Sequence, residues 1–318
     1  MKSKMESDGH KLNVVEFGCA SGGSSIDPLN AIKEASDNRK IKAIMNDLPL
    51  NNWEALKETL AKNVPEVEVE ICAQSMYKEA VAPKASLDLA YSCFTQHWLS
   101  VGIPADLPLE TGALWGNQLA QLPEYKDIYD KWATAARNDW ARFMELRAEE
   151  LRPGGIVVMH IQSAYVNGEM PAGLSHGCQV AKKQCLEEGI FTEAEARKLC
   201  MPEYGKNMLE IVTPFASAEN LKKWDLLEYH QLPGWALAED VVDPSVAKLS
   251  ESEQARRAVD LARAFMDSSI EVAFTDVTES VKKEKVDKFW EKVYEFGKDD
   301  SSKIDANFGA TLLAFERK

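Results

Sequence analysis

A glycine-rich turn near the amino terminus contains the first residues that could do chemistry. Residues 12–17 form an apolar run, and residues 18–23 read GCASGG before a helical pattern begins. In such a turn Gly18 and Gly22 let the backbone approach a ligand closely, and the helix amino terminus behind them favours electron-rich groups. Glycine turns also serve plain packing, so the turn alone is as consistent with no ligand as with one.

An acidic residue follows the second apolar run. Residues 41–45 read IKAIM, and Asp47 comes directly after them in the segment NDLP. A carboxylate after the second strand of an α/β unit can accept hydrogen bonds from both hydroxyls of a ribose. The alternative is that this segment only makes a turn and caps a helix, as Asn and Asp often do. The position after a second strand favours ribose binding.

The spacing of the glycines separates two classes of ribose-containing cofactor. A nicotinamide dehydrogenase uses the fingerprint G-x-G-x-x-G, which is broken here because Ala20 stands at its second glycine. S-adenosylmethionine has no phosphate but has an amino acid end, and Glu16 could lie near its ammonium group. Glu16 could also be only an acid at the end of a strand. The pattern therefore favours S-adenosylmethionine over a dinucleotide.

Alternating strands and helices are expected to position these residues. We predict strands at residues 12–17, 41–45, 67–71, 86–91 and 156–161, with helices at 51–62 and 125–151 among them. This rhythm is typical of a doubly wound, Rossmann-like α/β sheet covered on both faces, whose ligand lies at the carboxyl ends of the strands. All the candidate site residues fall at those ends.

The rest of the chain predicts a cap and a closing segment. Residues 164–267 are helical, acidic and punctuated by proline, and we assign them to a helical substrate cap on the S-adenosylmethionine-binding core of residues 1–163. Residues 268–318 are expected to close the core. Apolar runs at 270–274 and 308–315 there predict an antiparallel edge pair of strands with a charged helix between them.

Composition excludes several classes of partner. The 318 residues have a formal net charge of −14, so the basic surface of a nucleic-acid-binding protein is not expected. No apolar run is long enough to cross a bilayer, and no signal peptide is recognisable. The six cysteines are scattered, without the spacing of a metal site. We expect a cytoplasmic protein with free thiols that acts on a small molecule, and no position can be named for a metal.

Three segments in order resemble the SABATH family of salicylate, benzoate, jasmonate and theobromine-type methyltransferases. Residues 16–22, EFGCASG, are similar to the family's acid-x-Gly-Cys-Ser-Ser-Gly turn. Residues 46–53, NDLPLNNW, and 92–100, SCFTQHWLS, resemble its Asn-Asp-Leu-Pro and His-Trp-Leu-Ser segments. Further similar stretches at 139–155, 213–219 and 308–318 extend the resemblance over nearly the whole chain. It implies a class I methyltransferase fold and a homodimer.

The resemblance also implies roles for individual residues. Those expected to contact S-adenosylmethionine are Glu16, Gly18, Gly22, Asp47, Leu48, Ser75, Met76, Ser92 and Cys93. Those expected to line the acceptor pocket are Phe94, His97, Trp98 and Phe308. In the family the tryptophan matching Trp98 donates its indole N–H to the acceptor carboxylate, and His97 would add a polar contact or a wall. The alternatives are that Trp98, Phe308 and His97 are core residues.

One family feature is not found. Members open with a Ser-Tyr-Ala-x-Asn-Ser-x-x-Gln segment that closes over the cofactor and supplies a glutamine donor to the carboxylate, and the residues before Val14 do not match it. Another segment supplies that lid, or the pocket is more open, or the acceptor is not a carboxylate.

The expected activity is methyl transfer to the carboxylate of a small-molecule acid by in-line displacement. A carboxylate has a pKa of about 4, so it is already a nucleophile at neutral pH and needs no general base. Two alternatives stay open: N-methylation of a small nitrogen heterocycle, and a homologue that binds the cofactor without catalysis.

Overall fold

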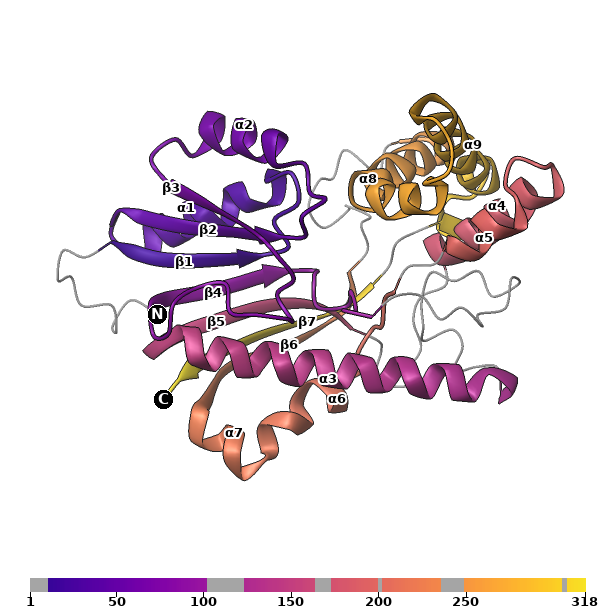
Figure 1. Ribbon diagram of the computed structural model, residues 1–318. Helices are drawn as coiled ribbons and strands as arrows, with labels where there is room; N and C mark the ends of the chain where they lie inside the picture. The colour runs from indigo at the N-terminus through magenta and orange to yellow at the C-terminus, as the bar shows by residue number, and fades with distance from the viewer. Residues whose placement is uncertain (1–10, 102–122, 164–172, 200–201, 236–248, 305–307) are drawn as a thin grey trace.

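The computed structural model describes residues 11–101, 123–163, 173–199, 202–235, 249–304 and 308–318 (Figure 1). The strands are β1 (Leu12–Phe17), β2 (Ile41–Asp47), β3 (Glu68–Ala73), β4 (Leu87–Cys93), β5 (Leu151–Ser163), β6 (Trp224–Trp235) and β7 (Phe308–Arg317). The helices are α1 (Ile26–Ala35), α2 (Trp53–Asn63), α3 (Lys126–Glu150), α4 (Gly173–Glu187), α5 (Glu193–Lys198), α6 (Met208–Val212), α7 (Ala218–Lys223), α8 (Glu251–Glu271) and α9 (Glu279–Gly297).

The strands form one sheet in the order β3-β2-β1-β4-β5-β7-β6. β1 lies between β2 and β4 and is parallel to both, so Val14 stands opposite Ala43 on one side and Leu89 on the other. β7 runs antiparallel to both β5 and β6. The mostly parallel sheet with an antiparallel edge pair, predicted from the sequence, is confirmed.

Helices cover both faces of the sheet. Leu12 and Val14 of β1 pack in an apolar cluster with residues of α1 and α2, whereas Val15 and Phe17 pack on the other face with residues of α3. This alternation follows from the two-residue period of a strand, and apolar residues at both phases bury both faces. At α2 the side chain of Asn52 accepts a hydrogen bond from the Ala55 N–H and caps the helix, as the asparagines there predict.

The prediction that residues 270–274 form the strand that pairs with β7 is wrong. Residues 270–274 are not a strand: α8 runs to Glu271, a 3-10 helix spans Val272–Phe274, and Ile270 and Phe274 are buried among helices. β6, which lies inside the range assigned to the cap, pairs with β7 instead. A short apolar run does not distinguish a strand from a buried helical turn, and the polar sequence of the edge strand β6 gave no strand signal.

Helices α4, α5, α8 and α9 form a separate helical unit (residues 173–199 and 249–304) with its own apolar core. It lies beyond the carboxyl ends of the parallel strands (Figure 1). The core contains Cys178 of α4, Met266 of α8 and Trp290 of α9, all at most 1% exposed. α9, expected to belong to the closing part of the sheet, therefore packs in this unit.

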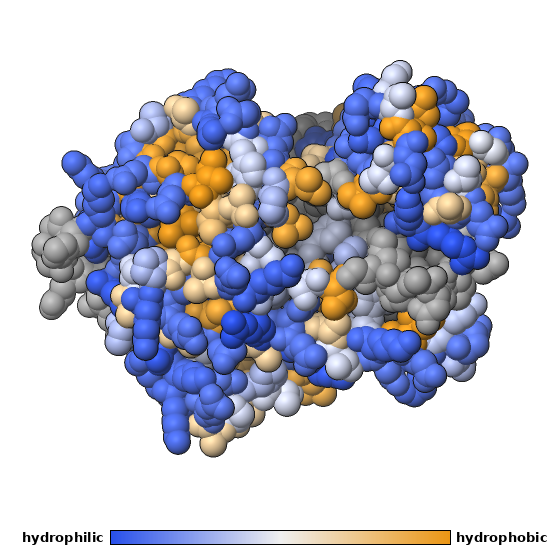
Figure 2. All heavy atoms as spheres, viewed as in Figure 1, coloured by the Kyte–Doolittle hydropathy of each residue, from blue (hydrophilic) through white to orange (hydrophobic). Residues whose placement is uncertain are grey.

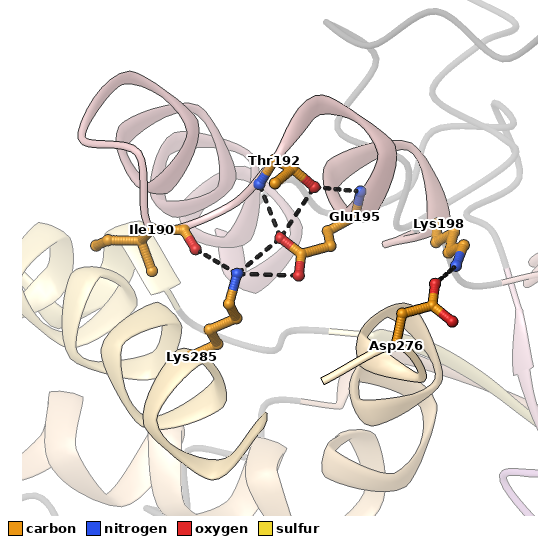
Figure 3. Close-up of polar contacts among 6 residues, drawn as sticks. All are labelled: Ile190, Thr192, Glu195, Lys198, Asp276 and Lys285. Carbon is orange, nitrogen blue, oxygen red and sulfur yellow. Dashed lines mark hydrogen bonds and ion pairs between the residues drawn. The ribbon is translucent and has the colours of Figure 1, made fainter. Parts of the chain in front are cut away.

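Polar contacts fix α5 to α9 within the helical unit (Figure 3). The Lys285 ammonium of α9 donates to the Ile190 carbonyl at 2.8 Å and to both carboxylate oxygens of Glu195 at 2.9 and 2.8 Å. Glu195 also accepts from the backbone N–H of Thr192, the capping residue of α5. Lys198 bonds Asp276 at 3.1 Å. Since Lys285 and Glu195 are both mostly buried, their pair fixes the geometry of this unit more firmly than a surface pair would.

Candidate active site

The glycine turn (residues 18–23) and Asp47 lie together at the ends of β1 and β2. The Gly18 N–H donates to the Asn46 carbonyl at 2.8 Å. One carboxylate oxygen of Asp47 accepts from the Ala20 N–H at 2.8 Å, and the other accepts from the Leu48 N–H at 2.7 Å. Each oxygen can still accept a further hydrogen bond, so the carboxylate is oriented and able to receive two hydroxyls. Burial raises the pKa of Asp47, and the two amide bonds oppose that shift.

Gly18 and Gly22 are required by their backbone conformation and by their neighbours. Both have positive φ angles, +73° and +83°. A Cβ on Gly18 would lie 2.2 Å from Oγ1 of Thr95, and a Cβ on Gly22 would lie 2.7 Å from Cδ1 of Leu56. Any larger residue at Gly18 would therefore push the turn away from the loop that follows β4.

Glu16 is buried at the end of β1 and points to the same face as Val14. Its carboxylate accepts a 2.7 Å hydrogen bond from the Tyr91 hydroxyl of β4. Burial raises the pKa of Glu16 to about 7, while hydrogen bonds from Ser25 and Tyr91 partly oppose this and the Asp47 charge adds to it. Glu16 is therefore poised to ionise when a cation comes near.

Ser92 and Cys93 lie at the end of β4, beside the end of β1. The Ser92 hydroxyl donates to the Phe17 carbonyl at 3.1 Å. The Cys93 sulfur lies 3.7 Å from Nδ1 of His160 in β5, and burial raises the pKa of its thiol to about 11. The Cys93 thiol is therefore neutral at physiological pH.

The remaining predicted cofactor contacts are Leu48, which follows β2, and Ser75 and Met76, which follow β3. Asn46 donates to the Cys72 and Gln74 carbonyls, both at 2.9 Å, which fixes the chain after β3. Ser75 is half-buried, whereas the Met76 side chain packs in the cluster against α3. Leu48 is 57% exposed. Contact of these three residues with a cofactor stays a prediction.

The segment of residues 94–100, which we call the tryptophan loop, leaves β4 in an unusual conformation. Phe94 has φ +49°, its N–H donates to the His160 carbonyl at 2.7 Å, and its ring lies 4.3 Å from the His160 ring. Thr95 donates to the Phe17 carbonyl at 3.2 Å, so the loop is attached to the end of β1. The loop thus begins in contact with the glycine turn.

Trp98 pairs with a segment that follows α5 in the chain. It forms an isolated antiparallel bridge with Glu203, in which the Tyr204 N–H donates to the His97 carbonyl at 2.8 Å. Trp98 is half-buried and packs against the helical unit. Its indole N–H makes no hydrogen bond with the described part of the chain. It is therefore suited to receive an acceptor group.

His97 is buried, and burial together with the nearby Lys206 charge lowers its pKa to about 3. The imidazole is thus neutral at physiological pH and does not act as a cation. Lys206 is also buried; its ammonium donates to the Gln96 carbonyl at 2.6 Å, and burial lowers its pKa to about 8. The Lys206 ammonium thus anchors the tryptophan loop, to which the buried His97 belongs.

Some predictions lie partly or wholly outside the described residues. Phe308 begins β7, but its side chain is not among those described, and the first ten residues are not described either. Among the described residues, no group of three or more His, Cys, Asp or Glu could hold a metal ion. Within the same residues, no helix is long and apolar enough to cross a membrane.

The structure adds residues that the sequence did not indicate. These are Tyr91 and Thr95, which contact Glu16 and the glycine turn, Asp139, which bonds Ser100, and Glu203, which pairs with Trp98. For Thr95 the sequence does contain a signal, because the glycines of the turn imply that another segment packs closely against its backbone. No sequence signal brings Glu203 beside Trp98, because the two are brought together only by the return of the chain from α5.

The glycine turn and the tryptophan loop both follow parallel strands, β1 and β4, at their carboxyl ends. The molecular surface is hollowed between the sheet and the helical unit (Figure 2). The arrangement provides a carboxylate for two hydroxyls, a buried acid for a cation, and an indole donor on an adjoining loop.

Comparison with known proteins identifies relatives of this chain. The family of SAM dependent carboxyl methyltransferases matches residues 1–316. Methyltransferase LUC1 of a Fusarium species is 27% identical over 213 residues, which cover 63% of this chain and 53% of LUC1. O-methyltransferase acrG of Aspergillus aculeatus is 25% identical over 253 residues, 76% of this chain and 63% of acrG. The chain thus spans less than two thirds of either relative.

A solved structure of loganic acid methyltransferase with SAH has a similar fold. The TM-score is 0.70 at 20% sequence identity, and the superposition covers 98% of this chain and 86% of the other. The likeness shows the class I methyltransferase fold.

Proposed function

Because the chain belongs to the family of SAM-dependent carboxyl methyltransferases, we propose that it methylates the carboxylate of a small-molecule acid and releases the methyl ester. The cofactor of this family is S-adenosylmethionine. When bound, it supplies an electrophilic methyl group on a sulfonium sulfur, and it offers ribose hydroxyls and an ammonium group to the protein.

The residues at the sheet edge fit this cofactor. The absence of a side chain at Gly18 lets the glycine turn pack directly against Thr95, and the oriented Asp47 carboxylate suits two ribose hydroxyls. Glu16, whose pKa is raised to about 7, would pair with the ammonium. Ser92 and Cys93 would form the wall beneath.

Trp98 would orient the acceptor through its indole N–H. Because the acceptor acid is already ionised at neutral pH, no general base is required, and the neutral His97 would act as a wall. Holding one carboxylate oxygen in line for attack can contribute about 7–11 kcal/mol to lowering the barrier. The helical unit would exclude water, which favours a reaction that consumes two opposite charges.

The observation that supports this proposal most is that the end of β4 and the tryptophan loop both bond the Phe17 carbonyl, directly before the glycine turn. That oxygen accepts from Ser92 at 3.1 Å and from Thr95 at 3.2 Å. The glycine turn and the tryptophan loop are therefore held together, as transfer between two bound molecules requires.

The experiment is calorimetric binding of S-adenosylhomocysteine, followed by transfer of labelled methyl to a panel of carboxylic acids and nitrogen heterocycles. We expect binding, and transfer to an acid that falls about 10–100-fold in Trp98→Phe. Trp53→Phe, the same change on α2, should retain transfer. Absence of binding would reject the cofactor site. Transfer to heterocycles alone would replace the proposal by N-methylation, and binding without any transfer would indicate a non-catalytic homologue.

We further propose that the enzyme is a cytoplasmic homodimer and that the helical unit caps the acceptor. The resemblance to the SABATH family supports the dimer, and the position of the unit beyond the strand ends supports the cap. Light scattering coupled to size exclusion tests the dimer: a mass near 71 kDa, twice the 35.5 kDa of the chain, is expected, whereas a mass near 35.5 kDa would reject it.

A further inference from the structure

The bridge between Trp98 and Glu203 determines which way both side chains point. Opposed residues of an antiparallel pair lie on the same face, with Cβ atoms about 4.5–5.5 Å apart. Their neighbours Leu99 and Tyr204 both pack in the apolar cluster on α3. Since side chains alternate, Trp98 and Glu203 point the other way, and Trp98 indeed packs against the helical unit.

The surroundings of Glu203 confirm this direction. Cys178, on α4 of the helical unit, has its thiol pKa raised first by burial and then by its proximity to Glu203. Lys206, three residues after Glu203, lies on the opposite side, where its ammonium meets the Gln96 carbonyl. The Glu203 carboxyl group therefore lies on the helical-unit side, beside the indole of Trp98.

Glu203 is a buried acid without a matching charge. It is 1% exposed, and its Oε2 atom has no hydrogen-bond partner among the described residues. Burial alone raises its pKa well above the usual range, with no contribution from a cation. Burial thus favours the protonated form of this carboxyl group, which has an O–H to donate. A buried polar atom without a hydrogen-bond partner destabilises a protein. Its presence is explained if a bound ligand supplies the partner.

We propose that Glu203, as a neutral acid, donates a second hydrogen bond to the acceptor carboxylate beside Trp98. This inference rests on the proposed function. In the SABATH family a glutamine of the lid donates to the acceptor carboxylate. Here Glu203, in the segment that follows α5, would take the place of that donor. An acceptor acid with a pKa of about 4 cannot remove the proton from a far weaker acid, so the O–H stays on Glu203. If Trp98 and Glu203 both donate to one oxygen of the acceptor carboxylate, the other oxygen is available to attack the methyl group.

The test compares two substitutions at this position with the wild type. Glu203→Gln keeps a neutral donor of the same shape, and Glu203→Met keeps the size but removes the donor. We expect kcat/KM for the acid to fall about 10–100-fold in the Met variant and to stay within about threefold in the Gln variant. Binding of S-adenosylhomocysteine should be unchanged in both, and the Met variant should unfold at no lower temperature.

Each other outcome overturns the inference. An unchanged kcat/KM in Glu203→Met would show that the acid does not contact this group. An equal loss of kcat/KM in both variants would show that an ionised carboxylate is needed at this position. That result would fit a methyl acceptor that donates an N–H group to Glu203. Lost S-adenosylhomocysteine binding in the Met variant would show a structural role. Failure of the proposed function is distinguishable, because then the wild type itself would methylate no acid.

Discussion

Asp139 of α3 accepts two hydrogen bonds from Ser100, whose backbone N–H and hydroxyl lie 2.7 and 2.6 Å from its two carboxylate oxygens. Ser100 ends the tryptophan loop, two residues after Trp98. Asp139 is 6% exposed, and both bonds are partly buried and made to a carboxylate, which makes them stronger than bonds between neutral groups. The long helix α3 thus fixes the end of the loop that carries the proposed donor.

Replacing Asp139 by Ala should affect the acceptor more than the cofactor. We expect kcat/KM for the acid to fall about tenfold, because Trp98 loses its fixed position, and the free energy of unfolding to fall by about 1–3 kcal/mol. Affinity for S-adenosylhomocysteine should change by less than about threefold. Steady-state kinetics and calorimetry measure the two effects. Asp130→Ala, an exposed change on the same helix, is the control, and equal losses of cofactor affinity and transfer would contradict this role.

Replacing Gly18 by Ala should abolish cofactor binding. The new Cβ would lie 2.2 Å from Oγ1 of Thr95, and φ is +73°, so both the clash and the backbone strain act against the native turn. We expect affinity for S-adenosylhomocysteine to fall more than about 100-fold, with a loss of stability of about 1–3 kcal/mol. Gly23→Ala is the matched control, because a Cβ there meets no atom within 4 Å. Equal binding by both variants would show that the turn does not approach the ligand.

The alternation of strands and helices made most of the sheet predictable. The strands β1, β2, β4 and β5 have apolar residues on both faces, and the edge strand β3 alternates glutamate with apolar residues, and both patterns are strong local signals. β6 was missed because it is an edge strand with polar residues such as Glu228 and Gln231, so its place depends on pairing with β7. Residues 270–274 were misread because an apolar run of this length fits a strand and a buried helix equally well.

The site was predictable where its parts are close in sequence. Asp47 and Gly18 follow strands whose ends must meet at one edge, so their proximity follows from the fold class. The bond between Asp139 and Ser100 and the pairing of Glu203 with Trp98 depend instead on how distant segments return to the sheet. Local patterns do not contain that information.

A buried ion pair on α3, next to Phe17 of β1, should be important for stability. Arg147 and Glu150 of α3 are at most 1% exposed and are joined at 2.6 Å, and the guanidinium lies 4.2 Å from the ring centre of Phe17. Glu150→Ala should lower the free energy of unfolding by about 3–5 kcal/mol, because Arg147 would keep a buried charge without its partner. Urea unfolding measures this. Glu145→Ala, which removes an exposed pair with Arg142, should cost no more than about 1 kcal/mol, and a similar loss in both would contradict the expectation.

Glu16 should make stability depend on pH. Its pKa is about 7 in the folded protein and 4.5 when unperturbed, so between these values only the folded state keeps the proton. The stabilisation from this proton is complete below pH 4.5 and is lost as the pH rises through about 7. We therefore expect the free energy of unfolding of the wild type, relative to Glu16→Gln, to fall by about 3 kcal/mol over that window. Urea unfolding of both proteins at several pH values measures it.

Glu16 should also couple cofactor binding to proton release. Near pH 6.5 the carboxyl group is mostly protonated, and the ammonium of S-adenosylhomocysteine beside it would favour the ionised form. Binding should then release a proton, and affinity should rise between pH 6 and 8. Calorimetry in two buffers of different ionisation enthalpy counts the protons released. Glu16→Gln should release none, since it has no group to titrate, whereas equal release by both proteins would place the ammonium elsewhere in the site.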